Sequence, residues 1–345
     1  MKKVFLIAAA VVALAACSKN EVLPSSSINN EISFNVAPRT KAAPAEAFDT
    51  HNVFASWAYY LPKGSSWDSP AVGVTPQEYI KGRTISYVGG VWKEDGKTYY
   101  WPKDGGKLTF FAYSLNRDNL TLTGGDSHFT CDAVTGISGA IDLMANKNTD
   151  FMVADIAKDK TANESLNSIN GVPTLFKHKL SKVACTVKKA SDYPNVTFEL
   201  NKIEFLSVSH YANYGQFVND GAGTTIKEVI TPGRKDTQVY TSATQEITST
   251  ATAVANEDVV IYIPQKFTDE TSKIEITYTI TTTVEGSTTP VVQTVVKEYP
   301  IKDKFAEWEM GKKYIFNLTF SLGEILWAPA VEPWVDAPAG SIDVM

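Results

Sequence analysis

Strict alternation of apolar and polar side chains is the feature that most limits how this chain can fold. In residues 313–321 the side chains of Tyr314, Phe316, Leu318 and Phe320 alternate with those of Ile315, Asn317, Thr319 and Ser321. Side chains on a β-strand point alternately to opposite faces, so this pattern predicts a strand with one buried face. We find no apolar stripe with the helical period that lasts longer than about two turns.

Further strands are predicted by the same reasoning at residues 108–114, 196–200, 259–263, 273–284 and 291–299. A change of phase after Leu200 predicts a turn or bulge at Asn201 and Lys202. Residues 91–94 and 98–101 flank Asp95-Gly96, a spacing that predicts a hairpin. Many short strands with Gly and Pro turns are typical of β-sandwiches, so the predicted fold class is all-β.

The length of the chain exceeds what one hydrophobic core normally organises. We therefore expect two tandem β-sandwich domains, at residues 31–173 and 174–322, with the boundary after a polar stretch that ends near residue 171. Residues 1–16 are expected to be a signal peptide and residues 17–30 a flexible tether. Residues 323–345 are expected to be a C-terminal tail.

The N-terminus has the pattern of an export signal. Lys2 and Lys3 precede an apolar run from Val4 to Ala16, and small residues stand directly before Cys17. This order is what lipoprotein signal peptidase requires, so Cys17 is predicted to carry lipid and to hold the protein at a membrane. The alternative is an ordinary secretory signal with an incidental cysteine.

Composition and motifs argue against several functions. The formal net charge is −6 and the sequence has no basic cluster, which argues against a nucleic-acid partner. There is no HExxH, GxSxG or Rossmann glycine pattern, so we predict neither an enzyme nor a bound cofactor. The four histidines are scattered, and no metal site is predicted. Cys131 and Cys185 are expected to be buried thiols, with one disulfide as the alternative.

Aromatic side chains crowd the first predicted domain: Trp57, Tyr59, Tyr60, Trp67, Trp92, Tyr99, Tyr100 and Trp101. Exposed Trp and Tyr rings can stack on sugars, so a glycan-binding face is conceivable. Aromatic residues are also favoured in strands and fill sandwich cores, which is the interpretation that we favour.

Several short motifs resemble one family in their order and spacing. Near the N-terminus they are the lipobox, that is, the small residues that end in Cys17, followed by Ser18-Lys19-Asn20-Glu21, and then Ile32-Ser33-Phe34 with Arg39 shortly after it. Further along the chain they are Tyr100-Trp101-Pro102 before residues 108–113, residues 176–183, residues 308–314, and Trp334-Val335-Asp336. Together they resemble the fimbrillin-like lipoproteins that build type V pili of Bacteroidales bacteria. The resemblance covers the whole chain.

This resemblance implies a fold and an assembly mechanism. The fold would be two transthyretin-like β-sandwich domains, and the protein would be exported as a lipoprotein. A trypsin-like or arginine-specific protease would then cut after the first strand, and the C-terminal segment of a neighbouring subunit would fill the groove. The position that matches the cleavage site is Arg39, with Lys41 as second choice. The implied partners are other pilin subunits, in a homo- or hetero-polymer.

The first strand has properties that suit such a mechanism. Ile32, Phe34 and Val36 alternate with polar residues, so they should share one buried face. Removing residues 31–39 would uncover core that each of these side chains covers, worth about 1.5 to 3 kcal/mol apiece. It would also leave unpaired backbone groups, which invite the addition of another strand.

The C-terminal tail is the candidate donor strand. Ile325, Trp327, Pro329 and Val331 repeat with a period of two, and Trp334 follows. Pro329 and Pro333 are tolerated in a strand that needs pairing on one side only. The alternative is that this tail packs as the last edge strand of its own sandwich.

The predicted function is that of a structural or tip subunit of a type V fimbria on the cell surface, supporting adhesion. A rival from a different class is a surface glycan-binding lipoprotein of a polysaccharide uptake system, with Trp67 and Trp92 as test positions. A lipoprotein hydrolase is a third possibility.

Overall fold

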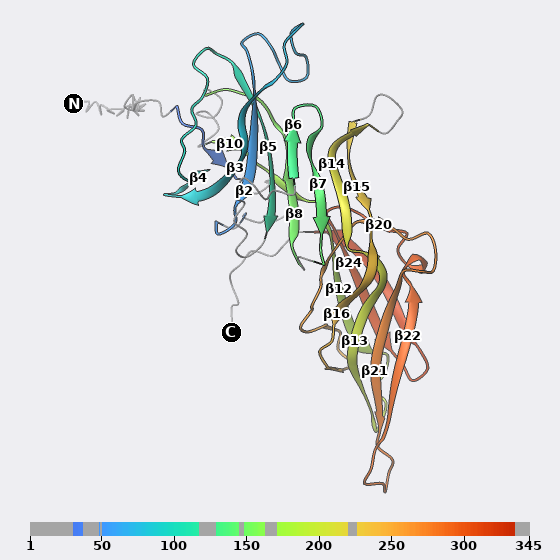
Figure 1. Cartoon of the computed structure of the whole chain (residues 1–345). Helices are drawn as coiled ribbons and strands as arrows, with labels where there is room; N and C mark the ends of the chain where they lie inside the picture. The colour runs from blue at the N-terminus through green and yellow to red at the C-terminus, as the bar shows by residue number, and fades with distance from the viewer. Residues whose placement is uncertain are drawn as a thin grey trace, which may run out of the picture.

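The computed structural model describes residues 30–36, 48, 50–116, 129–144, 148–162, 171–219 and 226–334. Strands dominate these residues and form two lobes, which confirms the all-β prediction (Figure 1). In this part of the chain no helix is both long enough and apolar enough to cross a membrane. Cys17, Arg39 and Lys41 lie outside the described residues.

The first lobe is built on a nine-stranded sheet in the order β10-β1-β4-β3-β2-β5-β8-β11, with β9 paired to β5. Its strands are β1 (Phe34–Asn35), β2 (Phe54–Leu61), β3 (Gln77–Val88), β4 (Val91–Glu94), β5 (Lys107–Asn116), β8 (Asp150–Ala154), β9 (Ala157–Lys160), β10 (Val172–Pro173) and β11 (Phe176–His178). The ring of Phe34 lies 5.4 Å from that of Phe54 on β2 and 5.8 Å from that of Phe110 on β5. Because β4 and β3 separate β1 from β2 along the sheet, these contacts show that the sheet curls over and encloses a core.

A four-stranded sheet packs on the other face of the first sheet, in the order β15-β14-β7-β6. Its strands are β6 (Phe129–Asp132), β7 (Gly136–Asp142), β14 (Tyr211–Asn219) and β15 (Ile226–Pro232). Tyr214 of β14 packs against Phe151 of β8, with ring centroids 4.9 Å apart. The β14–β15 hairpin follows residue 173 in the chain, yet its partner β7 precedes that residue, so this sheet draws strands from both sides of the expected boundary.

The second lobe is a sandwich of two five-stranded sheets. One has the order β18-β12-β24-β25 with β19 on β12, and the other has the order β16-β13-β21-β22 with β17 on β13. These strands are β12 (Ser181–Lys189), β13 (Val196–Ser209), β16 (Lys235–Thr241), β17 (Gln245–Ile247), β18 (Thr252–Ala253), β19 (Ile261–Tyr262), β21 (Lys273–Thr282), β22 (Val291–Pro300), β24 (Lys312–Phe320) and β25 (Ile325–Pro333). A short pair, β20 (Gln265–Lys266) and β23 (Glu307–Trp308), and the 3-10 turn η1 (Ile301–Asp303) complete the lobe.

Several sequence predictions hold in this lobe. Tyr314, Phe316, Leu318 and Phe320 of β24 are all buried. Strand β13 runs without interruption and changes register between Leu200 and Lys202, which confirms the predicted bulge. The strands predicted at residues 273–284 and 291–299 also form, and as β21 and β22 they pair in a hairpin that projects at the far end of the lobe (Figure 1).

The hairpin predicted between residues 91–94 and 98–101 is wrong. Strand β4 pairs with β3 instead, across a turn at Gly89-Gly90 whose φ angles of 62° and 89° suit glycine. Residues 99–101 pair with residues 30–32, a contact between segments far apart in sequence. Local turn chemistry therefore located a bend at Asp95-Gly96, with a positive φ at Gly96 alone, but not the partners of the flanking segments.

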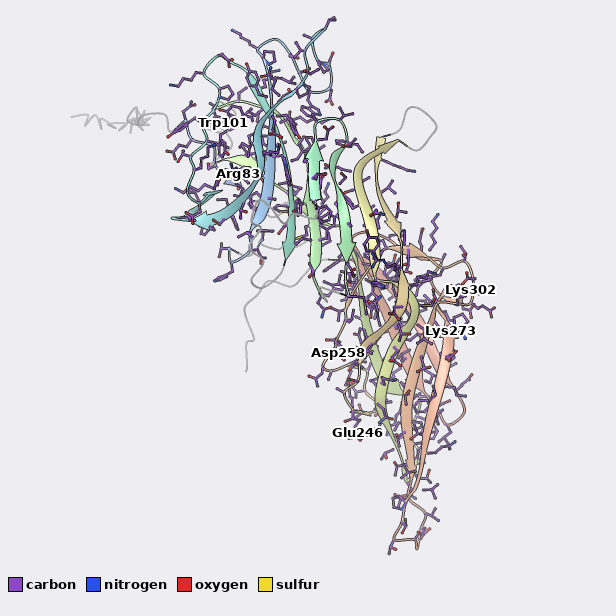
Figure 2. The ribbon with its side chains drawn as sticks, in the orientation of Figure 1. Arg83, Trp101, Glu246, Asp258, Lys273 and Lys302 are labelled. Carbon is purple, nitrogen blue, oxygen red and sulfur yellow. The ribbon has the colours of Figure 1, made fainter. Side chains whose placement is uncertain are left out.

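Short strand connections join the lobes: β11 leads into β12 through Lys179 and Leu180, and two further crossings are equally short. Strand β13 continues into β14 after His210 alone, and β15 continues into β16 through Gly233 and Arg234. The two crossings are tied to each other, since the His210 N–H donates to the Arg234 carbonyl at 3.0 Å and the Gly233 N–H to the Tyr211 carbonyl at 2.8 Å. Asn148 of the first lobe also donates to the carbonyl of Asp258, which Figure 2 places in the second lobe, at 3.0 Å.

Candidate assembly site formed by the first and last strands

Strand β1 lies between two neighbours rather than at the sheet edge. On one side it runs parallel to β10: the Val172 and Thr174 N–H groups donate to the Ser33 and Asn35 carbonyls at 2.7 and 2.9 Å. On the other side β1 faces β4, and the preceding residues pair with residues 99–101; the Ile32 N–H donates to the Tyr99 carbonyl at 2.8 Å. A strand in this position satisfies backbone groups on both sides, so its loss would leave an open slot.

The apolar face of β1 enters the core of the curled sheet. Ile32 is 6% exposed and Phe34 is 4% exposed, while Val36 is half-buried. Trp101, from the segment that pairs with residue 30, packs into the same core and lies in the first lobe in Figure 2. The sequence therefore predicted the inward side chains correctly, and their removability stays a prediction.

Gly171 lets the chain before β10 approach β1 closely. A Cβ atom at this position would lie 2.7 Å from the Ser33 carbonyl oxygen and 2.7 Å from the carbonyl carbon of Phe34. These are backbone atoms, so a larger residue would have to displace the strand itself. Its φ of 134° is also one that residues with a side chain rarely adopt.

The C-terminal tail is paired within its own lobe. Strand β25 runs antiparallel to β24, from Ile325 opposite Phe320 to Pro333 opposite Lys312. The Ser321 N–H donates to the Glu324 carbonyl and the Trp334 N–H to the Gly311 carbonyl, at 2.9 and 3.0 Å. In the single chain the tail therefore forms the last edge strand, which is the alternative that the sequence left open.

The hydrogen-bond pattern also explains the prolines of β25. Glu324 and Trp334 bond to the neighbouring strand, so the even-numbered residues between them face β24 and the odd-numbered ones face the free edge. Pro329 and Pro333 are both odd-numbered, and their missing N–H groups cost no ladder bond. Proline on an open edge also discourages unwanted strand pairing.

The tail is anchored mainly at its two ends. Ile325 is 3% exposed and Trp334 is 6% exposed, whereas Leu326 and Val331 are 54% and 51% exposed. The side chain of Trp327 lies outside the described residues. For the other residues of β25 whose side chains are described, at positions 326 and 328–333, the side chains are exposed and the backbone ladder is the main attachment.

Trp334, one of the two anchors, contacts residues near the junction between the lobes. Its ring stacks on His178 with centroids 4.1 Å apart and planes 9° apart, and Lys182 lies over the ring at 5.6 Å. His178 in turn contacts Asp150 on β8, with Nδ1 and Oδ2 2.7 Å apart. Sequence reasoning treated His178 as an isolated structural residue, and no local pattern linked it to the tail.

Comparison with known proteins assigns the chain to a family. The sequence matches the family described as fimbrillin-like over residues 43–334, which is most of its length. This chain belongs to the fimbrillin-like family. That membership places it among proteins of cell-surface appendages.

Solved structures support the same fold for this fimbrillin-like chain. A fimbrial protein from Bacteroides vulgatus is 19% identical, and the match covers 89% of this chain and 100% of that one with a TM-score of 0.61. A candidate cell adhesion protein from Bacteroides uniformis is 17% identical, with the same coverage and a TM-score of 0.50. No curated protein matches the sequence.

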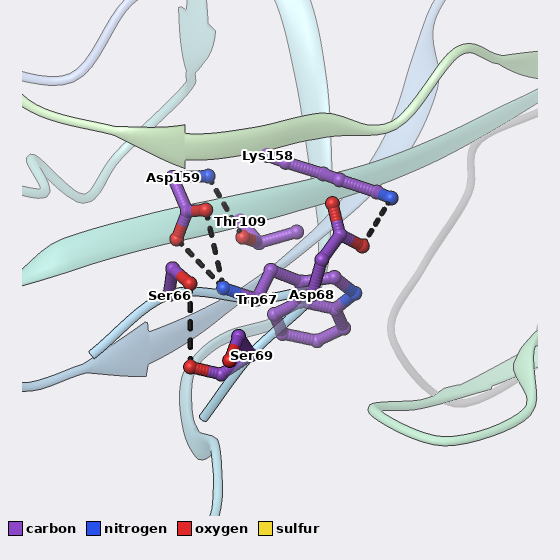
Figure 3. Close-up of polar contacts among 7 residues, drawn as sticks. All are labelled: Ser66, Trp67, Asp68, Ser69, Thr109, Lys158 and Asp159. Atoms are coloured by element: carbon purple, nitrogen blue, oxygen red, sulfur yellow. Dashed lines mark hydrogen bonds and ion pairs between the residues drawn. The ribbon is translucent and has the colours of Figure 1, made fainter. Parts of the chain in front are cut away.

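All but one of the aromatic residues considered for glycan binding pack in or against the core of the fimbrillin-like fold, and the exception is Tyr100, which is 51% exposed. Trp92 is buried, and the ring of Trp67 lies 5.5 Å from Phe111. The Trp67 N–H donates to both carboxylate oxygens of Asp159, at 3.0 and 3.1 Å, which fixes this loop against β9 (Figure 3). These contacts favour the interpretation that the aromatic cluster fills the core.

The two remaining cysteines are free thiols. Cys185 is buried and Cys131 is half-buried, and burial raises the pKa of the Cys131 thiol to about 12 and that of Cys185 well above its usual value. Both thiols therefore stay protonated at neutral pH and are poor nucleophiles. Among the residues that the structure describes, no three or more His, Cys, Asp or Glu side chains gather as a metal site requires.

Proposed function

We propose that this fimbrillin-like chain is a structural or tip subunit of a type V fimbria that polymerises by donor-strand exchange. The observation that carries the proposal is the position of β1. An N-terminal strand held between β10 and β4 would leave a two-sided slot, whereas an edge strand would leave none. Family membership supports assembly with other pilin subunits.

The proposed order of events starts at the N-terminus. Lipid on Cys17 holds the exported precursor at the outer membrane. A trypsin-like protease then cuts after Arg39 or after Lys41. In the sequence both residues come shortly after Val36, the last described residue next to β1. The cut separates the lipid from the folded lobes and frees β1 to leave.

The tail of the next subunit then fills the slot. Strand β25 suits this role because it is exposed over most of its length and its apolar residues repeat with the same period as those of β1. The odd-numbered apolar residues of the tail, among them Ile325, Trp327 and Val331, take over the inward-facing role of the first strand's side chains. The subunits are thus joined by backbone pairing and apolar burial together.

Limited proteolysis tests the processing step. We expect a chain that begins at residue 18 to lose residues 18–39 rapidly with trypsin at a low ratio, and then to form ladders of stable multimers. The measurement is N-terminal sequencing and denaturing gel electrophoresis without heating. A variant with Arg39→Gln and Lys41→Gln is the matched control and should stay monomeric. Rapid polymerisation of that variant with residues 31–36 still attached would contradict the proposal.

Truncation tests the donor role of the tail. Deleting residues 324–345 should leave a folded subunit that no longer polymerises after trypsin treatment, because the donor strand is gone. Deleting only residues 335–345 retains β25 and Trp334 and should preserve polymerisation. Circular dichroism checks folding and size-exclusion chromatography follows assembly. Normal multimer formation by the longer truncation would rule out β25 as donor.

A further inference from the structure

One short run of chain contacts both the first strand and the tail. Val172 and Thr174 hydrogen-bond to β1, and His178, four residues after Thr174, stacks on Trp334 at the end of the tail. We propose that residues 172–182, here called the connecting segment, couple the removal of β1 to the release of β25, with Trp334 on His178 as the latch. This inference rests on the proposed function, in which β1 is removed and β25 detaches from β24.

The first end of the connecting segment depends on β1. Strand β10 is the outermost strand of its sheet, and within the described strands it pairs with β1 alone. Val172 is 1% exposed in the core that also holds Ile32 and Phe34. When β1 leaves, β10 loses the strand with which it pairs, and the side chain of Val172 loses much of its apolar packing. This part of the connecting segment therefore becomes less stable.

Aromatic packing carries the change to the middle of the segment. Phe176 packs edge-on against Phe54 with centroids 5.3 Å apart, and Phe54 packs against Phe34 of β1 at 5.4 Å. Phe54 therefore stands between β1 and the connecting segment. Withdrawing Phe34 opens space on one side of Phe54, and tightly packed cores respond to such a loss by shifting neighbours.

The far end of the segment holds the tail by two routes. The His178 ring forms one face of the Trp334 site, and the Leu180 carbonyl accepts the Gly311 N–H at 2.9 Å. Gly311 itself accepts the Trp334 N–H at 3.0 Å. A displacement of residues 178–180 therefore acts on both the ring and the backbone of Trp334, which is buried.

Hydrogen exchange on monomers tests the coupling. We compare the chain starting at residue 18 with one starting at residue 37, which lacks β1; both retain every other described element. The proposal expects the amides of β25 to exchange about tenfold faster or more without β1. The amides of β22, an edge strand in the same lobe that does not contact the connecting segment through pairing, serve as the internal control and should not change.

Two substitutions sharpen the test. Trp334→Leu should give fast exchange in β25 whether or not β1 is present, because the latch is already open. Gly171→Ala in the chain starting at residue 18 should also accelerate hydrogen exchange in β25, because the added Cβ displaces β1. If the chain starting at residue 37 fails to fold, this variant tests the coupling in its place. Acceleration in β10 with unchanged exchange in β25 would overturn the coupling. The readout needs no polymer, so failure of donor-strand exchange would be recognised separately.

Discussion

Phe34→Ala is expected to lower the free energy of unfolding of the first lobe by about 3 to 5 kcal/mol. Phe34 is 4% exposed and packs edge-on against Phe54 and Phe110, so alanine would leave a cavity that the curled sheet cannot easily close. Urea unfolding followed by fluorescence measures the loss. The same variant should release residues 18–39 faster after trypsin cleavage, because the cut strand is then held by fewer contacts.

A smaller change in the same strand provides the control. Ile32→Val removes one methyl group from a residue that is 6% exposed, and it should cost about 0.5 to 1.5 kcal/mol. Its backbone bond to Tyr99 is unaffected. Equal stability losses for Phe34→Ala and Ile32→Val would show that β1 is held by its backbone pairing and not by its side chains.

Lys179→Met is expected to destabilise the protein by about 3 kcal/mol, at the low end for breaking a buried ion pair. Lys179 Nζ lies 2.7 Å from Glu228 Oε2, with side chains 9% and 28% exposed. Tyr214 donates its hydroxyl to the same carboxylate, and burial, followed by the charge of Glu228, raises the pKa of Tyr214 so that it stays neutral. Without Lys179 the Glu228 carboxylate keeps a hydrogen bond but loses its countercharge.

The double variant Lys179→Met with Glu228→Leu isolates the effect of the charge. Replacing both partners of a buried ion pair by apolar residues is often neutral, so most of the stability should return. Hydrogen exchange in β14 and β15 shows where the change acts, because this pair fixes the hairpin to the first lobe. A double variant as unstable as Lys179→Met would mean that shape, and not charge, determines the packing here.

Alternation predicted many strands of this protein but not their partners. The pattern of β24 and the phase change near Asn201 gave correct burial and a correct bulge, because both depend on local backbone geometry. Strand β3 was missed, since its buried residues Ile80 and Ile85 are five positions apart and a mixed pattern surrounds them. The pairing of residues 99–101 with residues 30–32 was also beyond local reasoning.

The candidate site shows the same limit. Alternation marked Ile32 and Phe34 as inward-facing and the tail as a strand, and both features are present. It could not show that β10 flanks β1, because a two-residue strand has no periodicity to detect. The stacking of Trp334 on His178 joins segments more than 150 positions apart, and nothing near either residue signals it.

The parallel pairing of β12 with β24 has a mechanical consequence for a fibre built in the proposed way. The ladder extends from Lys182 opposite Lys313 to Lys189 opposite Phe320. Tension would pull β12 from its beginning, toward the first lobe, and β24 from its end, where the tail departs. Because the strands are parallel, these forces act at opposite ends of the ladder and load all of its hydrogen bonds in shear at once. Such a subunit should resist stretching far better than one whose strands could be peeled apart bond by bond.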